Sequence, residues 1–371
     1  MKSLGIIAEL NPFHQGHKYL VEKAMKDTES DVCIAVMSGN FVQRGTPAVS
    51  DKWTRAQNAV KSGINLVVEM PAVFACNSAE YFAEAGVSIL EGFGCIDTIA
   101  FGSESGNLEE LRKTAEFLCV NDTVLHKRIG ELTKQGCSYP KARQTAVIEL
   151  DADFNENLIK SPNNILAVEY LKNIRTLKPY TLKRRGYGYH ESATMIREEM
   201  REENPEKFQR IDRAYWELVG AKILQTDSKR LETIFSAGEG LGNKLKNEIR
   251  YVSSTEQLIE RIKSKVYTYS RISRLLTHIL LDIDEKTMRE STKYIRILAL
   301  DDVGAKFLKE VKKKSCATLP ILTNINKEAK DFPEVAATLE KDILASDMYN
   351  IITDNDLYDY SDYIMKPYIE I

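Results

Sequence analysis

The opening residues of the chain pass from an apolar run to a polar turn and then to an amphipathic stretch. The apolar run covers residues 4–7, the turn is built on Asn11-Pro12, and residues 17–26 have helical spacing. This order predicts a strand, a loop and the beginning of a helix. Backbone N–H groups in the first turn of a helix lack intrahelical partners and attract anions, so the pattern predicts a phosphate-binding site here.

The same alternation continues along the first half of the chain. Further strands are expected at 32–37, 66–71, 98–101 and 180–185, with helices at 52–61 (capped by Asp51) and 78–91. Alternating strands and helices predict an α/β fold with a parallel, doubly wound sheet. The loops 38–47 and 102–106 follow two of these strands, at the sheet edge where open α/β sheets bind ligands.

Helical patterns dominate the rest of the chain. Residues 108–175 are mostly helical, and Ser161-Pro162 marks one helix start within them. Beyond residue 200 strand signals become rare. Helices are expected at 204–220, 228–234, 240–251, 255–284 and 285–300, with short strand signals at 294–298 and near 319–323. The pattern predicts two domains, a sheet domain over 1–200 and a mainly α-helical domain over 201–371.

Composition narrows the class of protein. A net charge of -3 gives no overall nucleic-acid signature, so any RNA contact must be a local patch. No apolar run approaches the roughly 18 residues needed to cross a bilayer, which predicts a cytoplasmic protein without a membrane partner. The six cysteines contain no Cys-x-x-Cys pair, so no metal site is predicted from them. The oligomeric state is not defined by the sequence.

The strongest chemical signal is the pair His14 and His17 around Gly16. Glycine lets the backbone approach a ligand, and two imidazoles can donate to the same phosphate oxygens. The alternative is a surface turn that carries incidental histidines. The position directly after a strand, at the start of a helix, favours the phosphate site.

These residues carry a family resemblance. Asn11-Pro-Phe-His-x-Gly-His17 resembles the signature of the nucleotidyltransferase superfamily named for its His-x-Gly-His motif. Together with Glu9, Ser38-Gly-Asn-Phe-Val-Gln-Arg-Gly45, Asp51-Lys-Trp-x-Arg55 and Lys263-Ser-Lys-x-Tyr-Thr-Tyr-Ser-Arg-Ile272, it resembles the bacterial tRNA(Met) cytidine acetate ligase family. The likeness spans both predicted domains.

The resemblance implies a Rossmann-like nucleotidyltransferase domain at 1–200, which binds ATP, and a tRNA-binding domain at 201–371. It also implies a two-step reaction. Acetate attacks the α-phosphate of ATP to give acetyl-adenylate and pyrophosphate, and the acetyl group then passes to the wobble cytidine of elongator tRNA(Met), giving N4-acetylcytidine. ATP, with Mg²⁺, is the expected cofactor.

The resemblance also assigns residues to the site. His14, His17 and Arg197 are the expected catalytic residues. Ser192 and Arg197 lie in a stretch that resembles the superfamily's second phosphate-binding signature, although Ser192 also suits a simple helix cap. The expected ATP-binding residues are Ile7, Ala8, Glu9, Leu10, Asn11, Pro12, Phe13, His14, Gln15, Gly16, His17, Lys18, Tyr19, Leu20, Gly102, Asn163, Arg184 or its neighbour Arg185, and Ser192.

Several charged residues keep two interpretations. Arg44 is expected to hold acetate or a tRNA phosphate, Glu9 to orient a histidine or aid Mg²⁺ binding, and Asp51 to cap its helix or act in catalysis. Residues 258–276 combine a helical apolar stripe with a basic face, which is either solvated or in contact with the tRNA backbone. The cations assigned to tRNA there are Lys263, Lys265, Arg271 and Arg274; Val266 stands where the family pattern has Arg, and Lys312 to Lys314 are more typical of a solvated helix end.

Two other functions remain open from the sequence. One is a different adenylyltransferase of the same superfamily, acting on a small phosphorylated cofactor precursor. It would share the first motif but would not need the helical domain or the basic segment. The other is a non-catalytic RNA-binding protein on the same core, against which the intact His14, Gly16, His17 and Arg197 argue.

Overall fold

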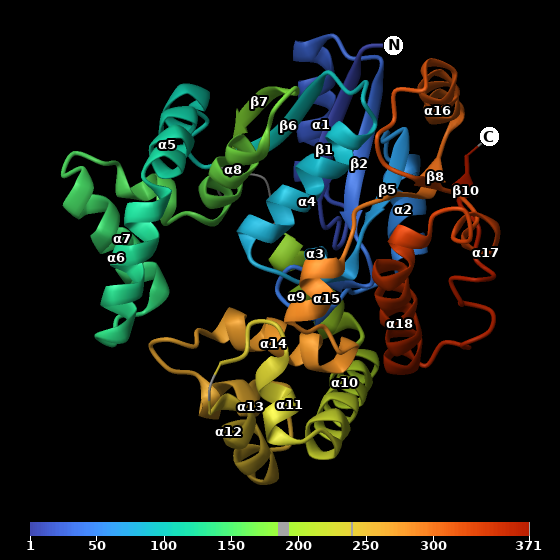
Figure 1. Ribbon diagram of the computed structural model, residues 1–371. Coiled ribbons are helices and arrows are strands. Elements are labelled where there is room, and N and C mark those ends of the chain that lie inside the picture. The colour runs from blue at the N-terminus through green and yellow to red at the C-terminus, as the bar shows by residue number, and fades with distance from the viewer. Residues whose placement is uncertain (185–192, 239, 371) are drawn as a thin grey trace.

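The computed structural model describes residues 1–184, 193–238 and 240–370, and its centre is a mixed β-sheet (Figure 1). The strands are β1 (Ser3–Ala8), β2 (Val32–Ser38), β5 (Leu66–Met70), β6 (Thr98–Ser103), β7 (Lys178–Lys183), β8 (Ile295–Leu300), β9 (Ile321–Leu322) and β10 (Tyr368–Ile369). Their order is β10-β8-β5-β2-β1-β6-β7, with β9 also paired to β8. The neighbouring strands β5, β2, β1, β6 and β7 are parallel to one another, and β8 pairs with β5 antiparallel.

Strand β2 shows why the sheet forms its core. Every residue from Val32 to Met37 is fully buried. Val32, Ile34 and Val36 face one hydrophobic cluster, whereas Cys33, Ala35 and Met37 face the other. A continuous apolar run is therefore what this strand needs, because helices cover the sheet on both sides.

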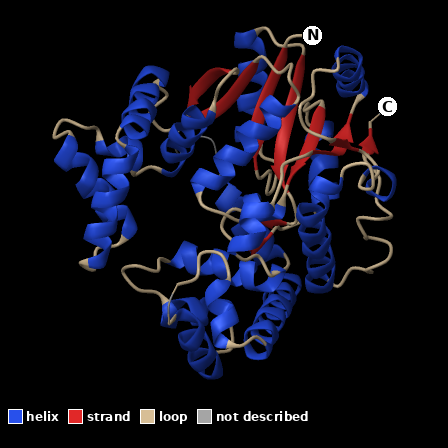
Figure 2. Ribbon diagram, viewed as in Figure 1, coloured by secondary structure: helices blue, strands red, loops and turns tan. Residues whose placement is uncertain are grey.

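Helices form a layer on each face of the sheet (Figure 2). The first face is covered by α1 (Gln15–Thr28) and α2 (Lys52–Lys61), which contribute Val21 and Ala56 to the same cluster as Cys33. The second face is covered by α4 (Ala79–Gly92), α8 (Pro162–Asn173) and α16 (Asp302–Lys314). The predicted α/β fold class is confirmed.

The remaining helices extend the molecule on two sides (Figure 1). Beside α8 lie α5 (Leu108–Val120), α6 (Asp122–Lys134), α7 (Tyr139–Leu150) and the 3₁₀ turn η1 (Glu156–Ile159). Short α3 (Ala72–Ala75) leaves β5 toward a second helical group. That group and the C-terminal helices comprise α9 (Ala193–Glu203), α10 (Pro205–Gln225), α11 (Ser228–Thr233), α12 (Leu241–Glu248), η2 (Ile249–Tyr251), α13 (Thr255–Ile262), α14 (Tyr269–Leu281), α15 (Glu285–Glu290), α17 (Ile325–Glu328), η3 (Pro333–Val335) and α18 (Ala336–Thr353).

Two predictions beyond residue 200 need correction. The expected helix over 285–300 ends at Glu290, and β8 follows, which confirms the short strand signal at 294–298. Because β8 returns to the sheet, the sheet takes strands from both sides of residue 200. All six residues of β8 are buried, and a short apolar run of this kind does not distinguish strand from helix by periodicity. The helix expected over 255–284 is two helices, α13 and α14. Between them the Ser264 hydroxyl accepts from the Tyr267 N–H at 3.1 Å, in a local turn that competes with helix.

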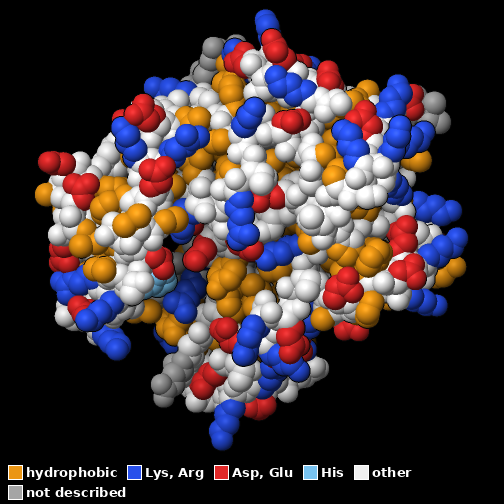
Figure 3. Space-filling view, turned by 45° about the horizontal axis from the view of Figure 1, so that its top comes forward, with side chains coloured by type: hydrophobic (Ala, Val, Ile, Leu, Met, Phe, Trp, Pro, Cys, Tyr) orange, Lys and Arg blue, Asp and Glu red, His pale blue; other side chains and the backbone are white. Residues whose placement is uncertain are grey.

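The surface carries both signs of charge. In the view of Figure 3, Lys and Arg side chains are scattered among Asp and Glu and are separated by uncharged and apolar surface. This agrees with the small net charge of -3 and with local rather than general attraction for anions. None of the helices in the described residues combines the length and the apolar character that crossing a membrane requires.

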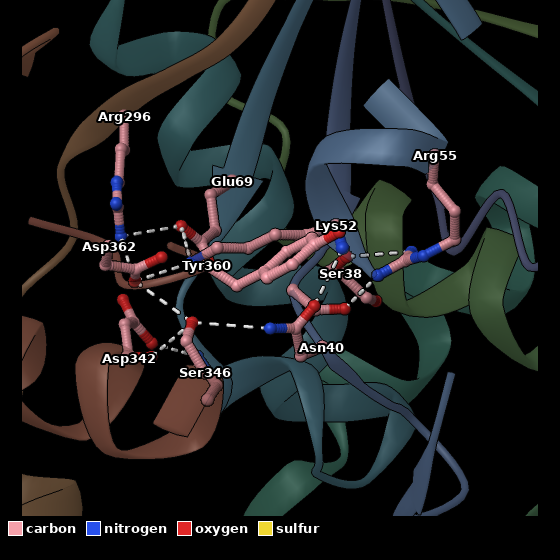
Figure 4. Close-up of polar contacts among 12 residues, drawn as sticks. Ser38, Asn40, Lys52, Arg55, Glu69, Arg296, Asp342, Ser346, Tyr360 and Asp362 are labelled. Carbon is pink, nitrogen blue, oxygen red and sulfur yellow. Dashed lines mark hydrogen bonds and ion pairs between the residues drawn. The ribbon is translucent and has the colours of Figure 1, made fainter. Parts of the chain in front are cut away.

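A buried cluster of four charges joins α2, β5, β8 and the C-terminal tail (Figure 4). Lys52 Nζ lies 2.7 Å from Glu69 Oε1 and 2.8 Å from Asp362 Oδ2. Arg296 Nη1 lies 2.8 Å from the same Asp362 oxygen and 3.1 Å from Glu69 Oε2. The side chains are at most 3% exposed, so two cations balance two anions away from water.

Removing one cation from this cluster should destabilise the fold. Lys52→Met leaves two buried carboxylates with Arg296 alone, and breaking a buried pair typically costs about 3–5 kcal/mol. Chemical denaturation should show a loss of this size in the free energy of unfolding. Lys26→Met, at an exposed position on α1, is the matched control and should change it by less than about 0.5 kcal/mol. Equal stability of the two variants would contradict the proposed role of the cluster.

Candidate functional site

The loop after β1 ends at His14, whose imidazole caps α1. Its backbone is extended, and its Nδ1 accepts a hydrogen bond from the Gly16 N–H at 3.0 Å. His17 completes a capping box, because its Nδ1 accepts from the His14 N–H at 3.3 Å. The ring centroids are 3.8 Å apart. The two imidazoles thus occupy the positions that Ser or Thr and Glu or Gln usually hold.

This arrangement fixes the state of both rings. Each Nδ1 accepts a hydrogen bond, so a neutral ring carries its proton on Nε2. Burial, and then the charges of Arg184 and Arg197, lower the pKa of His14 to about 4. Burial, and then His14 and Arg184, lower the pKa of His17 to about 3. At neutral pH both rings are uncharged and each presents an Nε2–H donor that capping does not use.

Gly16 is needed for this cap. A Cβ atom at this position would lie 2.7 Å from His14 Cε1 and 2.9 Å from its Nδ1. The N–H groups of His17 and Lys18 donate to the His14 carbonyl oxygen at 2.9 and 3.1 Å. The N–H groups of residues 16–18 are therefore already engaged by His14. The Nε2–H groups of the two imidazoles are the further donors at this turn, and the phosphate site stays a prediction.

Gly102, Asn163 and Arg184 come together beside the histidines. Arg184 Nη1 donates to Asn163 Oδ1 at 2.8 Å, and a Cβ atom on Gly102 would lie 3.2 Å from Arg184 Cγ. The Arg184 charge lowers the pKa of both imidazoles, so it lies within electrostatic range of them. Three positions expected to bind ATP thus converge, although they come from separate parts of the sequence.

Arg197 approaches the same turn from α9. Its Nη1 donates to the Asn11 carbonyl oxygen at 2.7 Å, and its Nη2 donates to Thr194 Oγ1 at 3.1 Å. Burial lowers the pKa of Arg197; the charge of Glu9 opposes this shift and that of Arg44 adds to it. Arg197 therefore remains a cation at neutral pH and lies near both residues, at the loop that leads to His14.

The hairpin of β3 (Phe41–Val42) and β4 (Thr46–Pro47) is attached to the first loop. Glu9 Oε1 accepts from the Gln43 N–H at 3.0 Å, and Asn11 Oδ1 accepts from the Val49 N–H at 2.9 Å. Among the described contacts, the Glu9 carboxylate thus binds the backbone of the hairpin and does not orient a histidine. Arg44 is exposed at the turn of this hairpin.

The other side of the hairpin contacts α14. The Gly45 carbonyl oxygen accepts from Thr277 Oγ1 at 2.9 Å and from Ser273 Oγ at 3.3 Å. Gly45 has φ of 71°, and a Cβ atom there would lie 2.4 Å from Arg274 Cα. Only glycine allows this turn and this approach. The hairpin therefore joins the ligand edge of the sheet to the basic segment of the sequence.

The Asp51-Lys-Trp-x-Arg55 stretch has structural partners. Asp51 Oδ1 accepts from the Thr54 N–H at 2.8 Å, which confirms the predicted helix cap. Arg55 is 2% exposed and donates to the carbonyl oxygens of Glu9 (2.7 Å), Ser38 (3.0 Å), Ser50 (2.9 Å) and Gly39. It therefore holds together the ends of β1 and β2 (Figure 4).

The basic segment divides into exposed and packed cations. Lys263 and Lys265 are exposed in the turn between α13 and α14, with Lys263 Nζ 2.5 Å from Glu260. Arg271 donates to the Ser236 carbonyl oxygen at 3.2 Å and lies over the Tyr267 ring. Burial lowers the pKa of Arg274 to about 10. The single basic helix face predicted by the sequence is therefore not formed.

The remaining predicted ligand residues have varied surroundings. Arg185 and Ser192 lie outside the described residues, so of the pair Arg184 and Arg185 only the contacts of Arg184 are described, and the choice between them stays open. Leu10 is fully buried with φ of 47°. Ile7 and Ala8 end β1, Pro12 and Phe13 are half-buried in the turn, Gln15, Lys18 and Tyr19 are exposed on α1, and Leu20 packs on the core.

No resident metal cluster accompanies these residues. In residues 1–184, 193–238 and 240–370, no group of three or more His, Cys, Asp or Glu side chains could hold a metal ion. One functional candidate was absent from the sequence-based set. Glu104 contacts Asn163 through two hydrogen bonds. The sequence feature that could have identified Glu104 is its position in a Gly- and Ser-rich loop directly after a strand.

A parallel sheet, a His-x-Gly-His turn at a helix start and two converging arginines define a nucleotidyltransferase site. Residues 1–362 match the family model described as HIGH Nucleotidyl Transferase. A relative named tRNA(Met) cytidine acetate ligase is 38% identical over nearly the whole length of both chains. This chain therefore belongs to the tRNA(Met) cytidine acetate ligase family.

Individual relatives agree with this placement. The ligase of Caldanaerobacter subterraneus subsp. tengcongensis is 38% identical, with 96% of each chain covered, and that of Clostridium novyi is 36% identical, with 99% covered. The crystal structure of apo Thermotoga maritima TmcAL has a TM-score of 0.90 at 30% identity, covering 100% of this chain and 99% of that one. The same protein bound with alpha-thio ATP has a TM-score of 0.89, again at 30% identity and with the same coverage.

The lowered pKa of His14 predicts a pH-dependent stability. Between about pH 6.5 and about pH 4 the His14 imidazole is protonated in the unfolded chain but stays neutral in the folded protein. The free energy of unfolding therefore falls as the pH falls through this range. His14→Asn keeps a good N-cap but does not titrate. Urea unfolding at several pH values should therefore show a shallower loss of free energy for His14→Asn than for the unmodified protein. Parallel curves would contradict the assignment.

Proposed function

We propose that this protein is an ATP-dependent ligase that acetylates the wobble cytidine of elongator tRNA(Met). In the first step an acetate oxygen attacks the α-phosphorus of ATP, and the bond to the β-phosphate oxygen breaks to release pyrophosphate. In the second step the exocyclic amine of cytidine attacks the acetyl carbon of acetyl-adenylate. AMP leaves, the amine loses a proton, and N4-acetylcytidine results.

One observation carries this proposal. His14, His17, Asn163, Arg184 and Arg197 converge at one loop cluster, in a chain whose relatives over nearly its full length are named tRNA(Met) cytidine acetate ligase. The solved relative bound with alpha-thio ATP supports ATP as the nucleotide.

The residues divide the work of the first step. The neutral Nε2–H groups of His14 and His17 donate to oxygens of the α-phosphate, where charge develops as acetate attacks. Arg184 and Arg197 are permanent cations and stabilise the charge that accumulates on the departing pyrophosphate. Because each group is already fixed by other hydrogen bonds, little reorganisation accompanies the reaction.

Mg²⁺ fits this site as a companion of ATP. It usually keeps several waters and binds through substrate phosphates with one or two carboxylates. The described residues offer Glu9 near the phosphate-binding loop and no cluster of three metal-binding side chains, which suits an ion that arrives with the nucleotide. When bound, it would neutralise phosphate charge alongside the two arginines.

For tRNA, the exposed cations between α13 and α14 are the best-supported contact. Lys263 and Lys265 are exposed there, whereas Arg271 is engaged with Ser236 and Tyr267. The β3–β4 hairpin links α14 to the nucleotide loop and presents Arg44 between them. We assign the residues beyond 200 that form α10–α14 to tRNA binding and keep Arg44 as a ligand for acetate or tRNA phosphate.

The competing enzyme function is adenylyl transfer to a phosphorylated cofactor precursor. It needs the same phosphate-binding groups but neither acetate nor tRNA. Whether ATP–pyrophosphate exchange depends on acetate separates the two functions, and acetyl transfer to a tRNA(Met) transcript separates the ligase from a non-catalytic RNA-binding protein.

His17→Gln tests the first step. Glutamine retains a capping acceptor at this helical position but lacks the imidazole donor, so acetate-dependent ATP–pyrophosphate exchange should fall about 10²–10³-fold. His126→Gln, at an exposed position on α6, is the matched control and should exchange at the unmodified rate. Exchange by His17→Gln at that rate would contradict the assignment, and exchange without acetate would favour the cofactor alternative.

Neutralising both exposed lysines tests the tRNA contact. Lys263→Gln with Lys265→Gln should lower the slope of log affinity against log salt by about 0.7–0.9 for each lost phosphate contact, while exchange without tRNA stays unchanged. Lys312→Gln with Lys313→Gln removes the same charge from the exposed end of α16 and serves as control. Binding measured over a series of salt concentrations should separate the two pairs; equal slopes would remove Lys263 and Lys265 from the interface.

A further inference from the structure

The loop after β6 contains a carboxylate with three hydrogen bonds to the start of α8. Glu104 Oε1 accepts from the side-chain amide of Asn163 at 2.7 Å and from its backbone N–H at 3.1 Å. Glu104 Oε2 accepts from the Asn164 N–H at 2.7 Å. Ser161 holds the N-cap position but makes no side-chain capping bond. The cap of α8 therefore comes from a residue 59 positions earlier in the chain.

These contacts determine which way the Asn163 amide points. An ionised carboxylate only accepts hydrogen bonds and a guanidinium only donates them. Asn163 Nδ2 therefore faces Glu104, and Asn163 Oδ1 faces Arg184 Nη1 at 2.8 Å. The opposite amide orientation would place a donor against Arg184 and an acceptor against Glu104, so it is excluded.

We propose that Glu104 is a positioning residue for ATP, acting through Asn163 on Arg184. Arg184 is an exposed side chain, and Asn163 Oδ1 is its side-chain hydrogen-bond partner among the described residues. An exposed arginine otherwise loses considerable side-chain entropy when it binds a ligand. The carboxylate and amide hold it beforehand near the two imidazoles, which lowers that cost.

The charge of Glu104 is compatible with this role. It lies at the positive end of the α8 dipole and accepts the backbone N–H groups there, which stabilises the anion. The same contacts occupy the two N–H groups that would make the start of α8 a phosphate site. Arg184, which Asn163 of α8 holds, rather than the N-terminal end of α8 itself, is then the group that meets ATP.

Glu104→Gln tests the inference, which rests on the proposed function. Glutamine keeps the size of the side chain but replaces one accepting oxygen by a donating NH₂, so it cannot accept from both Asn163 and Asn164 and its hold on the Asn163 amide is weakened. With saturating acetate, the KM for ATP in pyrophosphate exchange should rise about tenfold, while kcat changes less than about twofold. Glu110→Gln, at an exposed position on α5, should leave both constants unchanged.

Combination with Arg184→Ala separates positioning from a general structural effect. If Glu104 acts through Arg184, Glu104→Gln should raise KM little further once Arg184 is absent. An equal tenfold rise in KM with and without Arg184 would overturn this relay from Glu104 through Asn163 to Arg184. A rise for Arg184→Ala but none for Glu104→Gln would overturn the relay and leave the proposed ATP site intact. An unchanged KM for Arg184→Ala would overturn the relay and the assignment of Arg184 together.

Discussion

Two hydrogen bonds in the first turn of α1 determine what this site can do. The Nδ1 atoms of His14 and His17 accept backbone N–H groups, so both rings carry their proton on Nε2. Burial keeps the rings neutral. Neutral donors orient a phosphate without adding positive charge, and the charge itself must come from elsewhere. In the proposed site Arg184, directly after β7, and Arg197 on α9 supply it, so the motif alone would not be a complete site.

The site depends equally on the loops that hold the first turn in place. Arg55 binds the carbonyl oxygens at the ends of β1 and β2. Glu9 and Asn11 each hold one side of the β3–β4 hairpin, whose Gly45 carbonyl accepts hydroxyl groups from α14. The loop before His14 is therefore connected to α14 through this hairpin, in addition to its direct contact with Arg197 of α9. Any displacement of α14 on binding RNA has a direct route to the nucleotide loop.

Much of this organisation could be predicted from local patterns. Helical and strand periodicity located the parallel strands, and the order strand, turn and helix located the turn that carries His14 and His17, because these signals depend on neighbouring residues. Features set by distant partners could not be read in the same way. The cap of α8 by Glu104 joins residues 59 positions apart, and the short strand signal at 294–298 does not reveal that β8 pairs with β5. The break between α13 and α14 depends on a serine turn that competes with an otherwise helical pattern.

Arg55, in the Asp51-Lys-Trp-x-Arg55 stretch, shows how an arginine with a structural role differs from one proposed to bind a ligand. In the sequence Arg55 belongs to a motif shared with the resembled family, and Arg184 is an expected ATP-binding residue. In the structure Arg55 directs Nε, Nη1 and Nη2 to backbone carbonyl oxygens in a buried setting, so it has little left to offer a ligand. Arg184 is exposed and directs Nη1 alone to a side chain among the described contacts. A guanidinium that is buried and engaged by backbone carbonyl groups acts within the fold, whereas an exposed guanidinium beside the two imidazoles can still reach a ligand. This difference in surroundings, rather than charge in a motif, is why Arg184 and not Arg55 is proposed to meet ATP.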